Sequence, residues 1–233
     1  MVRQGTNASV RSLVIFFLET WTEIFDPHLC PDEIHRGKHI TIRIYPITRR
    51  GFAVQERLIH SGYYTYMERN IGRGWRQFLK TQDSLTILIY IEDLDKFVLV
   101  RQPREALITY ENPEGMVTEC VAGRFDKSVT PMELAILEAK QEAGITLYEA
   151  DIELLNKGKS MPVSPGSTTE RAYLAYAIVT SERMGSDQQQ FSAEDEDERI
   201  TRLLVDPGDL MEQGCEDLRV FTLLQYHIHE MDL

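Results

Sequence analysis

Two glutamates stand four residues apart near the middle of the chain, and on a helix this spacing puts both carboxylates on one face. They are Glu138 and Glu142, with Gln141 beside them. Two like charges at this spacing disfavour a helix by a few tenths of a kcal/mol unless a counter-charge is present. A divalent cation supplies that charge, and Mg²⁺ typically uses one or two carboxylates together with water and substrate phosphates. A solvated helix face is the alternative explanation for the pair.

The segment that carries this pair has clear helix start and stop signals. Thr130 and Glu133 have the spacing of a capping box, Pro131 takes the first helical position, and Gly144 supplies the end. One side of the segment is apolar, through Met132, Ala135, Ile136, Ala139 and Ala143. We therefore expect a helix over residues 131–143 with one buried face.

The stretch of residues 123–145 resembles the Nudix box, G-x5-E-x7-R-E-U-x-E-E-x-G-U, in which U is a bulky aliphatic residue. The positions that match at their required spacing are Gly123, Glu138, Glu142, Gly144 and Ile145. Polar positions of the box are replaced here by Val129 (first Glu), Leu137 (Arg) and Gln141 (a later Glu). The orienting Arg–Glu charge pair is thus lost as a whole, which avoids an orphan charge and indicates structural replacement.

Flanking segments are similar to the nucleoside-diphosphate-sugar branch of these hydrolases, which includes ADP-ribose, UDP-glucose and GDP-mannose pyrophosphatases. Residues 98–104 resemble its V-L-V-R-Q-x-R strand, and residues 119–123 resemble its E-x-x-A-G segment. Residues 164–166 followed by Glu170 are similar to its S-P-G…E segment, and the acidic run 194–198 before Ile200 to its acidic loop. The resemblance spans about residues 75–226, in the order of the branch.

The resemblance implies a set of metal ligands and a cofactor. In this branch the ligands are commonly an alanine carbonyl and two box glutamates, which here are Ala122, Glu138 and Glu142. Gln141 keeps an oxygen ligand but loses a charge, so weaker metal binding is expected. The implied cofactor is Mg²⁺, with Mn²⁺ as a substitute. A loop carboxylate usually completes such a site as base or ligand, and Glu198 or Glu196 takes that position unless the acidic run is only a solvated loop.

The resemblance also implies a set of substrate-binding residues: Arg104, Arg76, Arg219 and Glu170. Arginine suits a diphosphate because its planar fork meets phosphate oxygens bidentately. Arg104 matches a substrate-contacting arginine of the branch, whereas Arg76 and Arg219 lie near equivalent positions and have a plain surface charge as the alternative.

Composition limits the classes of partner. The chain has 233 residues, with 25 Lys and Arg against 37 Asp and Glu, which gives a net charge of −12. This argues against a broad nucleic-acid surface. The three cysteines are far apart, so neither a zinc site nor a disulfide scaffold is expected, and the default setting is cytoplasmic. The longest apolar runs fall far short of the roughly 20 residues that span a bilayer, so we expect no membrane partner.

The remaining pattern predicts a mixed α/β or α+β chain. Residues 8–26 have the apolar spacing of an amphipathic helix, with packing on its own domain or a dimer contact as alternatives. Strands are expected over residues 39–45, 52–59, 75–80, 86–91, 97–100, 152–157, 172–179 and 200–205, with a buried hairpin at 86–100, a mobile loop at 181–198 and a last helix at 220–231.

These observations together predict a Nudix-type α/β/α sandwich over residues 83–233, preceded by an N-terminal helix and antiparallel strands over residues 1–82 that form a homodimer contact. The expected function is Mg²⁺-dependent hydrolysis of a nucleoside diphosphate sugar or a related nucleoside diphosphate derivative, giving a nucleoside monophosphate and a sugar phosphate. The alternative is a catalytically impaired Nudix-fold module that binds a nucleotide or a protein partner.

Overall fold

The computed structural model describes residues 42–45, 54–126, 128–185, 190–191 and 200–231. The helix predicted over residues 8–26 and the acidic run 194–198 lie outside this part of the chain. No helix within it is long and apolar enough to cross a bilayer.

The first four strands form a sheet of their own, in which every neighbour is antiparallel. They are β1 (Ile42–Tyr45), β2 (Val54–Ser61), β3 (Thr65–Asn70) and β4 (Trp75–Lys80), in that order across the sheet. β3 was not predicted from the sequence, because its buried position carries a charged side chain. Glu68 of β3 accepts a hydrogen bond from Arg57 Nε at 2.5 Å, and that guanidinium lies over the Trp75 ring at 4.4 Å.

The second sheet has nine strands, and β5 (Ser84–Ile91) lies in its middle. β5 is parallel to β11 (Arg171–Val179) and antiparallel to β6 (Lys96–Pro103) and β8 (Val121–Arg124). The other strands are β7 (Met116–Glu119), β9 (Ile152–Leu154), β10 (Met161–Pro162), β12 (Gln190–Phe191) and β13 (Ile200–Val205). The predicted β5–β6 hairpin is confirmed, and every residue of β5 is buried.

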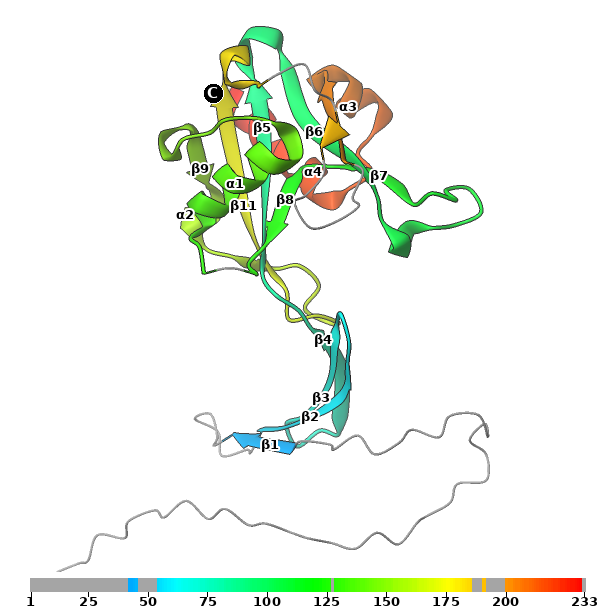
Figure 1. The fold of residues 1–233 in the computed structure, drawn as a ribbon. Coiled ribbons are helices and arrows are strands. Elements are labelled where there is room, and N and C mark those ends of the chain that lie inside the picture. The colour runs from blue at the N-terminus through cyan, green and yellow to red at the C-terminus, as the bar shows by residue number, and fades with distance from the viewer. Residues whose placement is uncertain (1–41, 46–53, 127, 186–189, 192–199, 232–233) are drawn as a thin grey trace, which may run out of the picture. The chain divides into compact units, whose positions relative to one another are not determined.

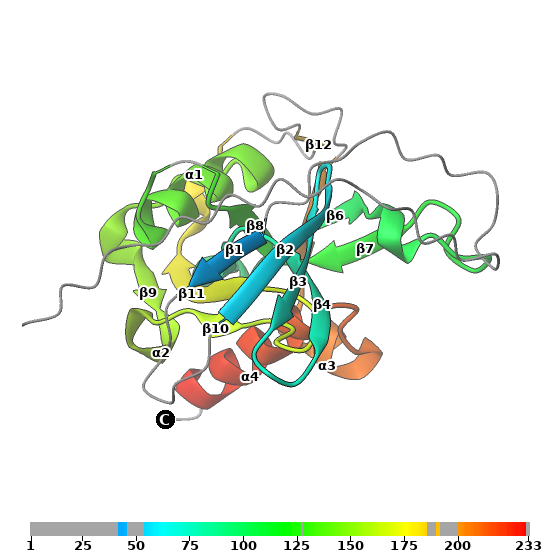
Figure 2. The ribbon, with the colours of Figure 1, turned by 90° about the horizontal axis from the view of Figure 1, so that it is seen from below.

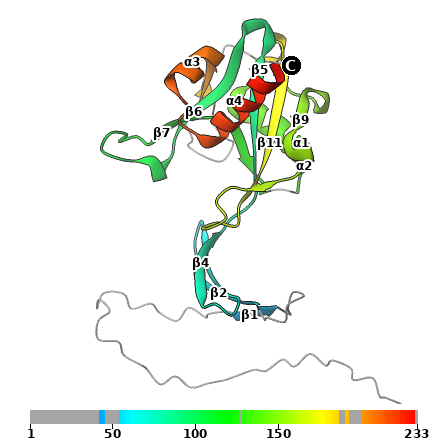
Figure 3. The ribbon, with the colours of Figure 1, turned by 180° about the vertical axis from the view of Figure 1, so that it is seen from behind.

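Helices cover both faces of this sheet. α1 (Pro131–Ala143) lies on one face, as Figure 1 shows, and α4 (Leu218–Met231) lies on the other, as Figure 3 shows; Figure 2 gives both in one view. The two faces alternate along β5: Leu85 and Ile87 pack with α1, whereas Leu88 packs with α4 and with α3 (Pro207–Gln213). This arrangement confirms the predicted α/β/α sandwich.

The element boundaries agree closely with the sequence at α1 and less well elsewhere. Thr130 Oγ1 accepts from Glu133 N at 3.2 Å, Glu133 Oε2 accepts from Thr130 N at 2.7 Å, and Gly144 has φ 66°. The strand expected over residues 152–157 ends at Leu154, because the short helical turn α2 (Leu155–Gly158) follows it with left-handed backbone at Asn156. The seven-residue helix α3 was not predicted from the sequence either.

A buried histidine on α4 gives the fold a dependence on pH. The Nδ1 atom of His227 lies 2.6 Å from the Tyr176 hydroxyl, and its ring packs against Tyr90 and Phe97. Burial lowers the pKa of His227 from its ordinary value of 6.5, and the charge of Asp95 opposes that shift. The unfolded chain therefore takes up a proton first as the pH falls, and the folded state loses stability below about pH 6.5.

We expect His227→Gln to remove this part of the acid sensitivity, because an amide can still hydrogen-bond the tyrosine hydroxyl but does not titrate. Urea unfolding between about pH 5 and pH 7.5 measures the slope of the unfolding free energy against pH. His229→Gln is the control for the substitution itself, because His229 lies exposed on the same helix. An unchanged slope in the His227 variant would contradict the prediction.

Candidate functional site

α1 places Glu142 in a buried position against β8. Its side chain accepts a hydrogen bond from the Ala122 backbone N–H at 3.1 Å, and the residue is 7% exposed. Burial raises the pKa of Glu142 to about 8 against the pull of that hydrogen bond, and the charges of Glu138 and Glu119 push in the same direction as burial. A carboxylate held this way is poised to receive a cation, which would compensate its desolvation.

Gly123 makes the room that the Glu138 carboxylate occupies. A β-carbon added at Gly123 would lie 2.2 Å from Glu138 Oε1 and 2.4 Å from its Cδ. Any other residue at this position would therefore displace the carboxylate. Gly123, the first glycine of the box, thus has a direct physical role. It lets the half-buried Glu138 lie against β8 at the position next to Ala122.

A third carboxylate belongs to the same face of the sheet, and the sequence analysis gave it no role. Glu119, at the end of β7, is paired with Arg104 and accepts from Gln102 Nε2 at 2.7 Å. Its charge and that of Arg104 both act on Glu142. Glu119 is the first residue of the E-x-x-A-G segment, which was the one signal that could have found it.

The chemistry of this cluster fits a hard divalent cation, since its donors are carboxylate oxygens. Among the described residues, no three His, Cys, Asp or Glu side chains converge closely enough to hold a metal by themselves. Glu138 and Glu142 with the Ala122 carbonyl therefore stay the predicted ligands. Gln141 is half-buried beside Glu142, and its ligand role stays a prediction. The predicted bases, Glu196 and Glu198, lie outside the described residues.

The two apolar replacements in the box leave no charge behind. Val129 packs against the core cluster around α1, and Leu137 is half-buried on the helix. An arginine from another element contacts the C-terminal end of α1. The buried Arg202 of β13 donates from Nη1 to the Ala143 carbonyl at 2.9 Å. A cation at a helix C-terminus is favourable, so this contact supports the helix that carries the two glutamates.

Two of the predicted substrate-binding residues are paired with each other. Arg219 Nη2 lies 3.1 Å from Glu170 Oε1, and the same oxygen accepts from Ser84 Oγ at 2.8 Å. Ser84 begins β5 and shares a side with Leu88, which packs on α4. This pair therefore lies at the end of the sheet on the α4 side, whereas Glu138 and Glu142 lie on the α1 side.

Arg76 is exposed in β4, where it faces Arg69 of β3. The described residues show no contact between Arg76 and the carboxylate cluster, so its role in substrate binding stays a prediction. Main-chain hydrogen bonds connect the end of β4 to the S-P-G segment: Leu79 N donates to Ser167 O at 2.8 Å, and Thr169 N donates to Leu79 O at 2.9 Å.

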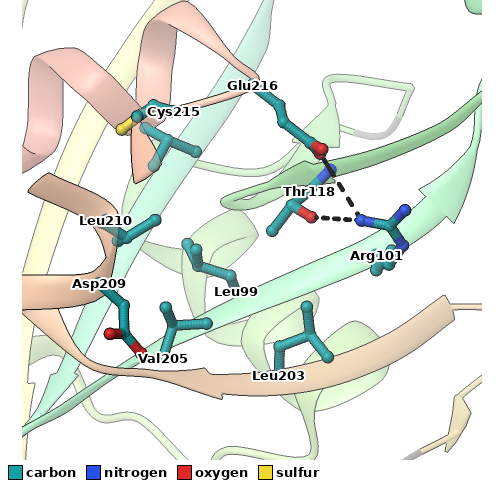
Figure 4. A pocket seen from close by; sticks show the side chains of 11 residues that line it. Leu99, Arg101, Thr118, Leu203, Val205, Asp209, Leu210, Cys215 and Glu216 are labelled. Carbon is teal, nitrogen blue, oxygen red and sulfur yellow. Dashed lines mark hydrogen bonds and ion pairs between the residues drawn. The ribbon is translucent and has the colours of Figure 1, made fainter. Parts of the chain in front are cut away.

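A separate pocket of about 310 Å³ opens on the α4 side of the nine-stranded sheet (Figure 4). Its wall is mixed: Leu99, Leu203, Val205, Leu210 and Val220 are apolar, and Asp209 adds a charged side chain. At its rim Arg101 Nη1 donates to Thr118 Oγ1 at 3.0 Å and lies 3.8 Å from Glu216 Oε2 (Figure 4). None of the predicted site residues lines this pocket, so the carboxylate cluster on the α1 side is the better candidate site.

The comparisons with known proteins point the same way. No family model matches the chain. The GDP-mannose pyrophosphatase of Enterobacter sp. (strain 638) is 29% identical over 160 residues, which cover 66% of this chain and 78% of that protein. The GDP-mannose pyrophosphatase of Pectobacterium atrosepticum is 29% identical over 175 residues, which cover 73% and 86%.

A solved structure, that of an ADP compounds hydrolase, superposes with a TM-score of 0.51 at 17% identity and covers 84% of this chain and 96% of its own. That likeness shows the fold, and the two pyrophosphatases carry the relationship in sequence. In sequence the chain is similar to the two GDP-mannose pyrophosphatases, and in fold it is similar to the ADP compounds hydrolase, which supports the Nudix pyrophosphatase-like relationship that the sequence motifs indicate.

Proposed function

We propose that the protein hydrolyses the diphosphate bond of a nucleoside diphosphate sugar, giving a nucleoside monophosphate and a sugar phosphate, with Mg²⁺ as its cofactor. One observation carries the proposal: Glu142 is buried against the Ala122 N–H, next to a Glu138 for which Gly123 makes room. A divalent cation would stabilise a buried carboxylate that lies next to a second, half-buried one.

The chain's own residues then have distinct tasks. Glu138, Glu142 and the Ala122 carbonyl would hold the cation, which when bound neutralises phosphate charge and lowers the pKa of a coordinated water. Arg104 binds phosphate oxygens through its fork. Water attacks one phosphorus, the bond from that phosphorus to the bridging oxygen breaks, and the proton of the water passes to a carboxylate. Glu198 or Glu196 is the predicted acceptor of that proton.

The substrate class follows from the relatives. Two are GDP-mannose pyrophosphatases, and the structural neighbour is named for ADP compounds. We therefore propose GDP-mannose as the first candidate, followed by UDP-glucose and ADP-ribose. The proposal includes a homodimer formed through residues 1–82, which the exposed Tyr63 and Tyr64 in the turn between β2 and β3 support. It also includes a cytoplasmic setting.

Incubation with GDP-mannose, UDP-glucose and ADP-ribose in Mg²⁺ tests the function directly. We expect release of the nucleoside monophosphate from at least one of them, measured by chromatography. Excess EDTA should stop the release, and added Mg²⁺ or Mn²⁺ should restore it, because the buried carboxylates need a cation. Failure to turn over any of the three, or turnover that EDTA leaves unchanged, would contradict the proposal.

A second candidate function, binding without hydrolysis, is favoured by one observation. The box has lost three charged side chains, and Val129 packs against the apolar core at the position of the first of them. The same reaction mixtures separate the two candidates. Calorimetric binding of GDP-mannose, with no nucleoside monophosphate released from any of the three substrates, would support the binding module and overturn the enzyme.

A further inference from the structure

Three N–H donors converge on a single oxygen of Glu119. Gln102 Nε2 donates to Oε1 at 2.7 Å, Arg104 Nε donates to it at 3.0 Å, and Arg104 Nη2 donates to it as well. One oxygen of Glu119 thus accepts from the Nε and Nη2 edge of the Arg104 guanidinium. The same oxygen also accepts from the neutral amide of Gln102.

The amide that completes this arrangement is well fixed. Gln102 is 2% exposed, and it lies on β6 directly opposite Val117 of β7, two residues before Glu119. Glu119 itself lies opposite Val100, which packs in the core with α1. Side chains of one strand alternate between faces, so Gln102 and Glu119 share the face that carries Glu138 and Glu142.

The backbone of Arg104 is held independently of its side chain. Its N–H donates to the Gly115 carbonyl at 2.9 Å. Gly115 has φ 64°, and a β-carbon there would lie 2.4 Å from the Arg104 carbonyl oxygen. Gly115 thereby fixes the main chain of Arg104, and Glu119 fixes its guanidinium.

From these contacts we infer that Gln102 and Glu119 are positioning residues, which hold the Arg104 guanidinium in the orientation that meets the substrate diphosphate. The inference rests on the proposed function, in which Arg104 binds phosphate. An unrestrained arginine loses rotamer freedom when it binds, and a side chain ordered in advance does not. A neutral glutamine suits the supporting position, because a second cation there would compete with Arg104 for the carboxylate.

A purely structural ion pair between β6 and β7 is the competing explanation, and steady-state kinetics separates the two. If Gln102 and Glu119 act through Arg104, then Gln102→Met and Glu119→Ala raise KM by about tenfold and change kcat by less than about threefold, since binding is lost equally in ground and transition states. A structural role lowers the melting temperature and leaves KM unchanged.

A double-mutant cycle gives the decisive result. It is measured in Mg²⁺ with whichever of the three substrates the wild type turns over best. In an Arg104→Ala background, neither Gln102→Met nor Glu119→Ala should raise KM further, and the Gln102→Met/Glu119→Ala pair should equal Glu119→Ala alone. Additive effects would overturn the inference. Thr118→Val is the matched control, because it breaks the Arg101–Thr118 contact on the same two strands and should leave KM unchanged. If Glu119→Ala does not fold, Gln102→Met in the wild-type and Arg104→Ala backgrounds gives the same comparison.

Failure of the inference is distinguishable from failure of the proposed function. Wild-type turnover with unchanged KM in both single variants overturns the inference alone. If the wild type turns over none of the substrates, calorimetry with α,β-methylene-ADP and Mg²⁺ replaces kinetics, and the Gln102→Met variant should bind this diphosphate about tenfold more weakly. Equal binding by the two proteins, or no binding by the wild type, overturns the inference.

Discussion

Replacing Glu142 by Gln is expected to lower Mg²⁺-dependent turnover at least about 100-fold while the protein stays folded. Groups that only orient a metal ligand already cost 10–100-fold when mutated, and Glu142 is proposed as a ligand itself. The glutamine keeps the size of the side chain and an acceptor for the Ala122 N–H, so only the charge is lost. The measurement is kcat/KM for the best substrate at saturating Mg²⁺.

Glu133→Gln on the same helix is the matched control for this loss. Glu133 is exposed and its carboxylate closes the capping box with Thr130, a task that glutamine also performs. Its turnover should stay within about twofold of the wild type. If Glu142→Gln kept more than about a tenth of the activity, Glu142 would not be a ligand of the proposed cation.

The same Glu142 substitution should have the opposite effect on stability when no metal is present. The pKa of Glu142 is raised to about 8 in the folded protein, from an ordinary value of 4.5. Between these values the unfolded chain releases its proton first, so folding is progressively disfavoured as the pH rises. In EDTA at about pH 8, Glu142→Gln should therefore unfold at a higher temperature than the wild type, and the two should converge toward about pH 5.

Gly123→Ala is expected to lower activity by at least about 100-fold with little loss of stability. The added methyl group would lie 2.2 Å from Glu138 Oε1, so the carboxylate must swing away from β8. The atoms that it meets belong to the end of a flexible side chain, which can move without disturbing the backbone. We therefore expect a change in melting temperature of a few degrees at most, measured together with kcat/KM.

Non-additivity distinguishes this mechanism from general damage to the sheet. Because Gly123→Ala is expected to act through Glu138, the double variant with Glu138→Gln should be no less active than Glu138→Gln alone. Gly208→Ala is the control, since no atom apart from its chain neighbours and the backbone of its own helix lies within 4 Å of the place its β-carbon would take. Full activity in Gly123→Ala would show that the position of the Glu138 carboxylate does not matter for catalysis.

The elements that the sequence predicted well are those with local signals. The capping box at Thr130 and the stop at Gly144 fix α1 within the sequence itself, and continuous apolar runs identified β5 and β6. β3 carried no such signal, because its buried Glu68 is neutralised by Arg57 from another strand. A burial that depends on a partner 11 residues away has no periodic trace in the sequence.

The candidate site also has one part that local sequence signals reveal and another part that only the fold reveals. The spacing of Glu138 and Glu142 is local and readable, and the resemblance supplied Ala122 and Arg104. The Glu119 contact with Gln102 depends on the register between β6 and β7, which pair across an intervening loop. Only the folded sheet brings those side chains together, so no pattern of spacing could reveal that three donors converge on one oxygen.

The anchoring of α1 at both ends bears on how this chain can vary in length. The helix is fixed by Thr130 at its start, and by Gly144 and the Arg202 contact at its end. One residue inserted between Glu138 and Glu142 would turn Glu142 by about 100° relative to Glu138 and separate the two carboxylates. Length variants among relatives should therefore avoid this turn of the helix.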